Sequence, residues 1–115
     1  MQKTNIVVRR DLRPGLQAAQ AGHALTDLIL KYTEQAKRWR DESNFLIILS
    51  VANEQELSEL SRELSRTEML WSGFREPDLN NSLTAVAVLP SRYTERFFEN
   101  LPLALKEVKC NGMPE

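Results

Sequence analysis

The chain has 115 residues, of which 42% are hydrophobic, and its formal net charge is −1. This length suffices for one hydrophobic core but not for two, so we expect a single domain over residues 1–115 with its core at about 4–105. The balanced charge argues against a protein that coats DNA, and no apolar run approaches the roughly 20 residues of a membrane span.

Strand and helix patterns alternate along the first half of the chain. "NIVV", residues 5–8, predicts a short strand, which Pro14 and Gly15 end in the turn "RRDLRPG". From about residue 16 to residue 38 apolar residues recur at helical spacing, and this pattern predicts one helix. The continuously apolar "FLIILSV", residues 45–51, is typical of a central strand that is covered on both faces.

The second half continues this alternation. Asn53 and Glu56 are spaced as a capping box at the start of a second helix with a stripe of leucines. Residues 69–74 and 83–89 predict two further strands, joined by the polar loop "REPDLNNS". We expect a short helix in "SRYTERFFENL" and a loose tail in the last residues, "KCNGMPE".

This order of elements favours an α/β fold. Strands that alternate with helices predict three layers, α/β/α, and the direct connection between the last two strands adds an antiparallel pair. We therefore expect a mixed, mostly parallel four-stranded sheet. Sites in such sheets gather at the carboxyl ends of strands, so the loops "RRDLRPG" and "REPDLNNS" should face the same crevice.

The single histidine is the first candidate site residue. His23 stands in "LQAAQAGHAL", where small side chains allow a ligand or another backbone to approach the helix closely. An imidazole titrates near cellular pH and suits acid or base catalysis. The alternative is a surface histidine on the polar face of an amphipathic helix, with Asp27 either orienting the ring or simply solvated.

Charged residues in the two loops are the other candidates. Arg9 and Arg13 border the first turn, where guanidinium groups suit phosphate or carboxylate binding and Asp11 suits a cap or an ion pair. Glu76 and Asp78 stand on either side of a proline in the second loop. They are candidates for acid/base groups or for orienting a water, and the alternative for these two acids and for the two arginines is solvated surface charge.

No motif in the sequence points to a metal or a cofactor. One histidine and one cysteine are too few for a structural zinc site, and no glycine-rich phosphate loop or G-x-S-x-G motif is present. The lone Cys110 cannot form an internal disulfide, and the start of the chain lacks the apolar region of a signal peptide. We therefore expect a cytoplasmic protein that needs neither a cofactor nor a metal.

The stretch "IVVRRDLRPGLQAAQAGHAL" resembles the opening of the type 2 peptidyl-tRNA hydrolase family, and the resemblance covers roughly residues 4–105. That family starts with a strand ending in V-V-R, then D-L, a glycine turn, and a helix with A-A-Q and a histidine. The resemblance implies a mixed sheet flanked by helices, frequent dimers, and metal-independent hydrolysis of the ester between a peptide and the 3′ ribose of tRNA. The matching residues are Val7, Val8, Arg9, Asp11, Leu12, Gly15, Ala18, Ala19, Gln20, His23 and Ala24.

The resemblance also implies roles for individual residues. His23 would activate water or position the ester, and Asp78 or Glu76 would replace the aspartate of the family's D-A-G-x-T loop. In two places the sequence departs from the family: the turn "RPGLQ" is shorter and lacks lysines, and "EPDLNNS" stands for D-A-G-x-T. The substrate-binding residues that the resemblance implies are Arg9, Asp11, Arg13 and Gln20.

Three functions follow from these observations. The first is a peptidyl-tRNA hydrolase-like enzyme whose partner is peptidyl-tRNA, with no role for DNA or a membrane, and with a homodimer as an option. The second is a non-catalytic module on the same fold that binds RNA or a protein, which the missing lysines favour. The third is a hydrolase of a small acyl or amide substrate.

Overall fold

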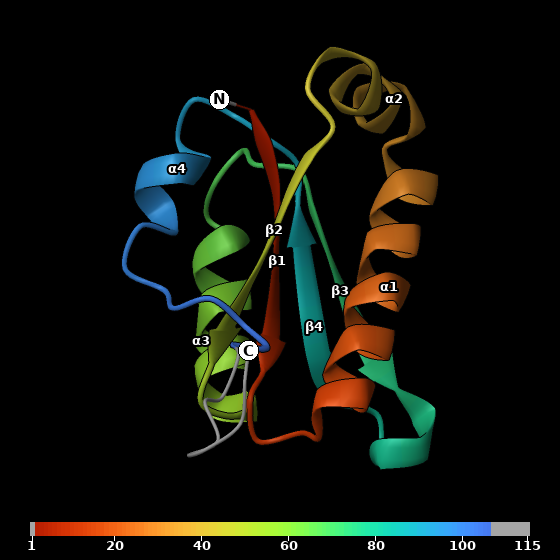
Figure 1. Cartoon of the computed structure of the whole chain (residues 1–115), viewed down its shortest axis with the longest axis vertical. Helices are drawn as coiled ribbons and strands as arrows, with labels where there is room; N and C mark the ends of the chain where they lie inside the picture. Colours follow the sequence, from red (N-terminus) through yellow and green to blue (C-terminus); the bar gives the residue numbers. More distant parts are fainter. Residues whose placement is uncertain (1, 107–115) are drawn as a thin grey trace, which may run out of the picture.

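A computed structural model describes residues 2–106, and the expected tail, with Cys110, lies outside these residues. Figure 1 shows a sheet with α1 and α2 on one face and α3 and α4 on the other, which confirms the three-layer α/β/α architecture. The strands are β1 (Lys3–Arg9), β2 (Phe45–Val51), β3 (Trp71–Glu76) and β4 (Ser82–Val88). The helices are α1 (Pro14–Lys31), α2 (Thr33–Glu42), α3 (Glu54–Leu64) and α4 (Thr94–Phe97), with a 3-10 turn at Pro77–Leu79.

The four strands form a mixed sheet in the order β2-β1-β4-β3. Only β1 and β2 are parallel, whereas β4 is antiparallel to both of its neighbours, β1 and β3. The expectation of a mostly parallel sheet is therefore wrong. The short connection after β3 reverses the chain, and β4 then inserts between β3 and β1, so that two of the three pairings become antiparallel.

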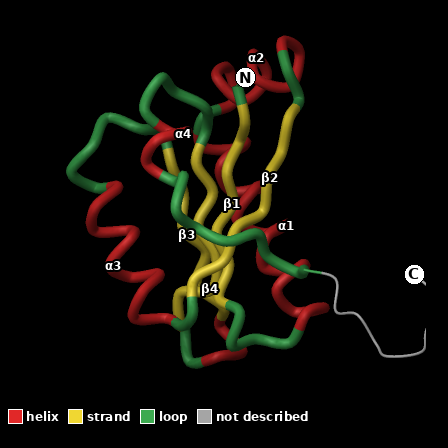
Figure 2. Tube along the Cα trace, turned by 60° about the vertical axis from the view of Figure 1, so that its left-hand side comes forward, coloured by secondary structure: helices red, strands yellow, loops and turns green. Residues whose placement is uncertain are grey.

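β2 lies at an edge of the sheet, although its apolar sequence is typical of a central strand. Its outer side meets the chain after α4 at one bridge, between Leu49 and Leu103, and Figure 2 shows that segment crossing in front of the strands. Phe45 and Leu46, at the start of β2, are each 46% exposed. The sequence of β2 is therefore apolar because helices cover the faces of the sheet, and not because β2 has a neighbouring strand on each side.

The helix predicted over residues 16–38 is divided into α1 and α2. Tyr32 separates them, with φ −127° and ψ 57°, outside the helical region. The hydroxyl of Thr33 donates to the carbonyl of Ile29 at 3.0 Å, and side-chain bonds of this kind compete with the backbone ladder of a helix. The apolar stripe continues across the break because Leu28 and Ala36 pack in the same core cluster.

The predicted capping box is confirmed at the start of α3. Asn53 Oδ1 accepts from the amide of Glu56 at 3.0 Å, and Glu56 Oε1 accepts from the amide of Ala52 at 2.7 Å. The first bond satisfies one of the amide groups that the first turn of a helix leaves free, and the second ties Glu56 back to the residue before the cap. The leucine stripe of α3 then packs against one face of the sheet, in a core separate from that under α1.

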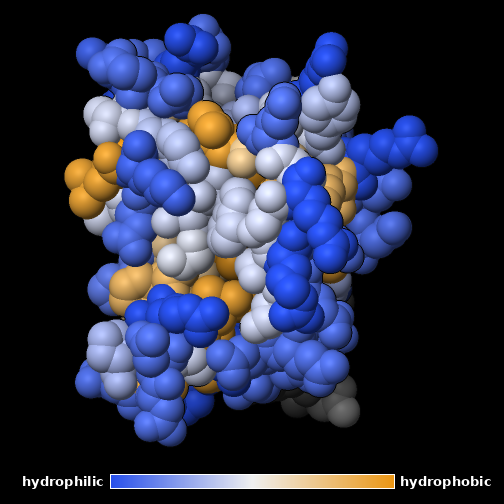
Figure 3. All heavy atoms as spheres, turned by 180° about the vertical axis from the view of Figure 1, so that it is seen from behind, coloured by the Kyte–Doolittle hydropathy of each residue, from blue (hydrophilic) through white to orange (hydrophobic). Residues whose placement is uncertain are grey.

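The surface of the molecule is mixed in character. Seen from behind, hydrophilic side chains cover the top, the bottom and the right-hand side, whereas paler and hydrophobic atoms lie in the middle and at the left edge (Figure 3). Over residues 2–106, none of the helices combines the length and the apolar character that crossing a membrane requires.

Candidate active site

The carboxyl ends of β1 and β3 lie at the same edge of the sheet, as predicted, because both strands run antiparallel to β4. The guanidinium of Arg9, at the end of β1, reaches the start of β4, with Nη1 at 3.4 Å from Ser82 Oγ and 3.3 Å from the carbonyl oxygen of Leu83. α1 begins immediately after the first loop, and Gln20 on this helix contacts Glu76 at the end of β3. The two predicted loops and the first half of α1 thus surround one region.

Gln20 is the centre of a hydrogen-bond network in this region. Its side chain is 1% exposed, Nε2 donates to Glu76 Oε1 at 2.9 Å, and Oε1 accepts from Thr84 Oγ1 at 2.6 Å. The amide of Asp78 donates to the other Glu76 oxygen at 3.3 Å. The bond from Gln20, then that from Asp78, and last the nearby charge of His23 lower the pKa of Glu76. Glu76 is therefore a fixed and ionised carboxylate.

His23 lies on the same flank of α1 as Gln20, three residues further along the helix. Its ring stacks on the ring of Phe74 in β3, with the centroids 4.6 Å apart and the planes at 20°. The side chain is otherwise exposed. The region thus combines an accessible imidazole with the ionised carboxylate of Glu76, which is an arrangement suited to moving a proton.

Arg9 and Asp11 form a bidentate ion pair. Arg9 Nε and Nη2 donate to the two carboxylate oxygens of Asp11 at 3.0 and 2.9 Å. This hydrogen bonding is the main cause that raises the pKa of Arg9 and lowers the pKa of Asp11. Because the guanidinium also faces β4 and is only 13% exposed, the pair braces the first loop.

Arg13 differs from Arg9 in being exposed at the start of α1. Together with Gly15, Leu16 and Ala19 it lines an open depression of about 550 Å³. The first turn of α1 carries no acidic residue, and no side chain caps its amide groups. Ala19 precedes His23 by one helical turn on α1, and the depression carries positive charge from Arg13 and from the helix end.

Two acidic residues that the sequence suggested, Asp78 and Asp27, contribute no side-chain bond to this network within the described residues. Asp78 is exposed in the 3-10 turn, and it joins the network through its backbone amide, while its carboxylate makes no hydrogen bond or ion pair with residues 2–106. Asp27 is partly exposed and likewise forms no bond to His23. The structure thus brings together Gln20, His23 and Glu76 and leaves Asp78 at the rim.

Thr84 and Phe74 are two members of this region that sequence reasoning did not assign. Thr84 lies in the buried part of β4, and Phe74 lies two residues before Glu76 in β3. For Thr84 the signal was the family resemblance, in which Ser82 and Thr84 are the hydroxyl residues nearest to the missing threonine of the D-A-G-x-T loop. For Phe74 it was the period of two that puts residues 74 and 76 on one face.

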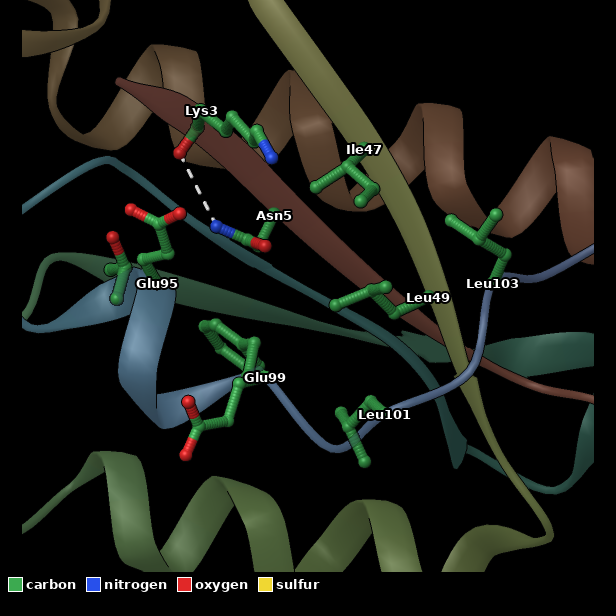
Figure 4. Close-up of a pocket in the computed structure, with 10 residues that line it drawn as sticks. Lys3, Asn5, Ile47, Leu49, Glu95, Glu99, Leu101 and Leu103 are labelled. Carbon is green, nitrogen blue, oxygen red and sulfur yellow. Dashed lines mark hydrogen bonds between the residues drawn. The ribbon is translucent and has the colours of Figure 1, made fainter. Parts of the chain in front are cut away.

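A cavity of about 340 Å³ lies on the opposite face of the sheet, between β1, β2 and α4 (Figure 4). Lys3, Asn5, Leu49 and Glu95 are among the residues that line it. It contains none of the candidate residues, so we assign the candidate active site to the polar network and not to this cavity. Over the described residues, no three histidine, cysteine, aspartate or glutamate side chains are grouped as metal ligands.

Comparison with protein-family models finds a match over residues 2–103 to the model described as Peptidyl-tRNA hydrolase PTH2. The matched range contains all four strands, both loops and every residue of the network. None of the curated proteins matches the chain.

Proposed function

Because the chain belongs to the peptidyl-tRNA hydrolase PTH2 family, we propose that it hydrolyses the ester between a peptide and the 3′ end of tRNA at the network of His23 and Glu76. Family membership supports the reaction, which is that of a hydrolase acting in translation. The observation that carries the choice of residues is the Gln20–Glu76 hydrogen bond of 2.9 Å, which holds an ionised carboxylate near the only imidazole.

In this proposal His23 is the general base. Its neutral imidazole takes a proton from a water molecule as the water oxygen attacks the carbonyl carbon of the ester. The tetrahedral intermediate then expels the 3′ oxygen of the ribose, which receives the proton from the imidazolium. The carboxylate of Glu76 stabilises that imidazolium, and the exposed carboxylate of Asp78 orients the attacking water from the rim.

The substrate-binding residues have divided tasks. Arg13 and the free amide groups at the start of α1 bind the terminal phosphates of the tRNA. Arg9 and Asp11 act together by holding the first loop in place, as their bidentate geometry supports. Gln20 acts on the substrate only through Glu76. With two exposed arginines, Arg10 and Arg13, in place of several lysines, we expect phosphate binding that is weak and sensitive to salt.

The test is the release of peptide from an N-acyl-aminoacyl-tRNA by the purified chain. His23→Ala should lower kcat by about 10²- to 10⁴-fold, the usual contribution of a general base. Asp27→Asn, on the same helix but without a bond to His23, is the matched control and should retain the activity. Equal rates for His23→Ala and the natural sequence would remove His23 from the chemistry.

A non-catalytic module that binds RNA or a protein is the second candidate. The observation in its favour is that Asp11 engages Arg9, which leaves Arg10 and Arg13 as the exposed arginines of a loop without lysines. Tight binding of tRNA without any hydrolysis would support this module. Turnover of small esters or amides without turnover of the tRNA substrate would instead favour an enzyme with a small acyl substrate.

The proposal extends to a cytoplasmic location and to a homodimer. The location follows from the substrate, because aminoacylated tRNA is used in the cytoplasm. The dimer rests on the resemblance to the family, and sedimentation equilibrium of the purified chain tests it directly.

A further inference from the structure

The ring of Phe74 is the one aromatic surface that His23 contacts among the described residues. The two rings lie nearly parallel, with 4.6 Å between their centroids. Phe74 is opposite Ala85 in the neighbouring strand, and the small alanine side chain leaves room for the phenyl ring to lean toward α1. One helical turn before His23 stands Ala19, which is too small to hold an imidazole in place.

The contact belongs to a paired arrangement between α1 and β3. Gln20 and His23 are three residues apart on the helix, and Phe74 and Glu76 are two residues apart on the strand. Gln20 contacts Glu76 and His23 contacts Phe74, so the two residues of α1 meet the two residues of β3 in reverse order. The stack therefore fixes where the imidazole lies relative to the carboxylate of Glu76.

We propose that Phe74 is the positioning residue of His23, and that its ring face holds the imidazole in the orientation from which it acts on the ester. An exposed histidine on a helix otherwise samples several rotamers, and only a fraction of them is competent for the reaction. Stacked aromatic pairs contribute an energy equivalent to about a threefold to tenfold change in such populations. The effect on the reaction rests on the proposed function, whereas the effect on the ring orientation does not.

Proton NMR tests the orientation directly, since His23 is the only histidine of the chain. In an untagged protein the two carbon-bound protons of its ring are the only imidazole signals. The ring current of Phe74 should displace them upfield, Phe74→Leu should abolish that displacement, and Phe74→Tyr should keep it. Phe97→Leu is the matched control, because Phe97 pairs with Phe98, at 4.9 Å, and lies in the core on the other face of the sheet.

Kinetics tests the consequence for the reaction. Phe74→Leu should lower kcat by about threefold to tenfold and leave KM unchanged, because positioning of a general base is used after the substrate has bound. Phe74→Tyr should restore most of kcat, and Phe97→Leu should leave kcat unchanged at a comparable loss of stability. A lower kcat at unchanged KM in Phe74→Leu, but not in Phe97→Leu, separates a positioning role from a general loss of folded protein.

Two results would overturn the inference. If the imidazole signals are the same in Phe74→Leu and in the natural sequence, the stack does not form. If the signals move but kcat does not, the stack forms without serving the reaction. A natural sequence without any turnover would contradict the proposed function alone, and the NMR displacement would still decide whether Phe74 holds the ring.

Discussion

Thr84 and Thr4 allow the same substitution to be compared at a buried hydroxyl with a hydrogen-bond partner and at one without a partner among residues 2–106. Both lie in strands of the sheet and both are 0% exposed. Thr84 Oγ1 donates to Gln20 Oε1 at 2.6 Å, with the carbonyl of Phe74 at 3.2 Å, whereas Thr4 Oγ1 has no partner among residues 2–106. Replacing each threonine with valine removes the hydroxyl and nearly preserves the shape of the side chain.

The two substitutions should therefore change the free energy of unfolding in opposite directions. Thr84→Val leaves the buried Gln20 Oε1 without its donor, at a cost of about 1–3 kcal/mol. Thr4→Val removes a hydroxyl whose burial is not compensated, and the free energy of unfolding should rise by about 1 kcal/mol. For a domain of this size each kcal/mol corresponds to a shift of about 4 °C in Tm.

The assay is urea unfolding followed by circular dichroism, with Tm from thermal scans as a second measurement. Equal slopes m for the two variants and the natural sequence would show that the comparison concerns native-state contacts. A Thr84→Val variant as stable as the natural sequence would refute the reasoning, because the Gln20 network would then contribute nothing. A Thr4→Val variant that loses stability would show that the Thr4 hydroxyl has a partner, such as a buried water.

Three further predictions concern the charges of the site. Gln20→Leu should raise the pKa of Glu76 towards its ordinary value. Because the pKa of Glu76 is lowered in the folded chain, the Gln20–Glu76 bond stabilises the fold at neutral pH, and this contribution disappears as the pH falls through the lowered pKa. The loss in free energy of unfolding should therefore be larger at about pH 7 than at about pH 3. Asp11→Asn should lower the free energy of unfolding by about 0.2–1 kcal/mol at neutral pH, because Arg9 loses its ion pair. In thermal scans the difference in Tm between this variant and the natural sequence should vanish in acid, where Asp11 of the natural sequence is protonated. Arg13→Ala should raise KM for the tRNA substrate and reduce the slope of log KM against log salt concentration by about one.

The sequence predicted those features that depend on local chemistry. The capping box of Asn53 and Glu56 was predicted to the residue, because it requires only two polar side chains at a fixed spacing. The strand over residues 45–51 has the predicted bounds. Its place at the edge was not predictable, because strand order depends on where β4 inserts, and nothing within residues 45–51 records that insertion.

The candidate site shows the same division between local and long-range information. His23 and the two loops were predicted from local composition and from the family resemblance, and their convergence followed from strand direction. The Gln20–Glu76 and Thr84–Gln20 bonds join residues 56 and 64 positions apart. One sequence does not reveal such pairs, because a buried glutamine and a buried threonine can each be satisfied by many partners.

The choice between Glu76 and Asp78 as the partner of His23 depends on the local path of β3. Phe74 pairs with Ala85 and Arg75 with Leu83, so Thr84 is the extra residue of a bulge in β4, whereas β3 keeps its period of two and presents Phe74 and Glu76 on the face that α1 covers. Glu76 is the last residue of β3, and its carboxylate receives the bond from Gln20. Asp78 comes after the chain has turned and contributes its amide to the same carboxylate. The two acids are therefore not interchangeable: Glu76→Gln should remove the charge that stabilises the imidazolium, whereas Asp78→Asn preserves both that charge and the amide that holds it.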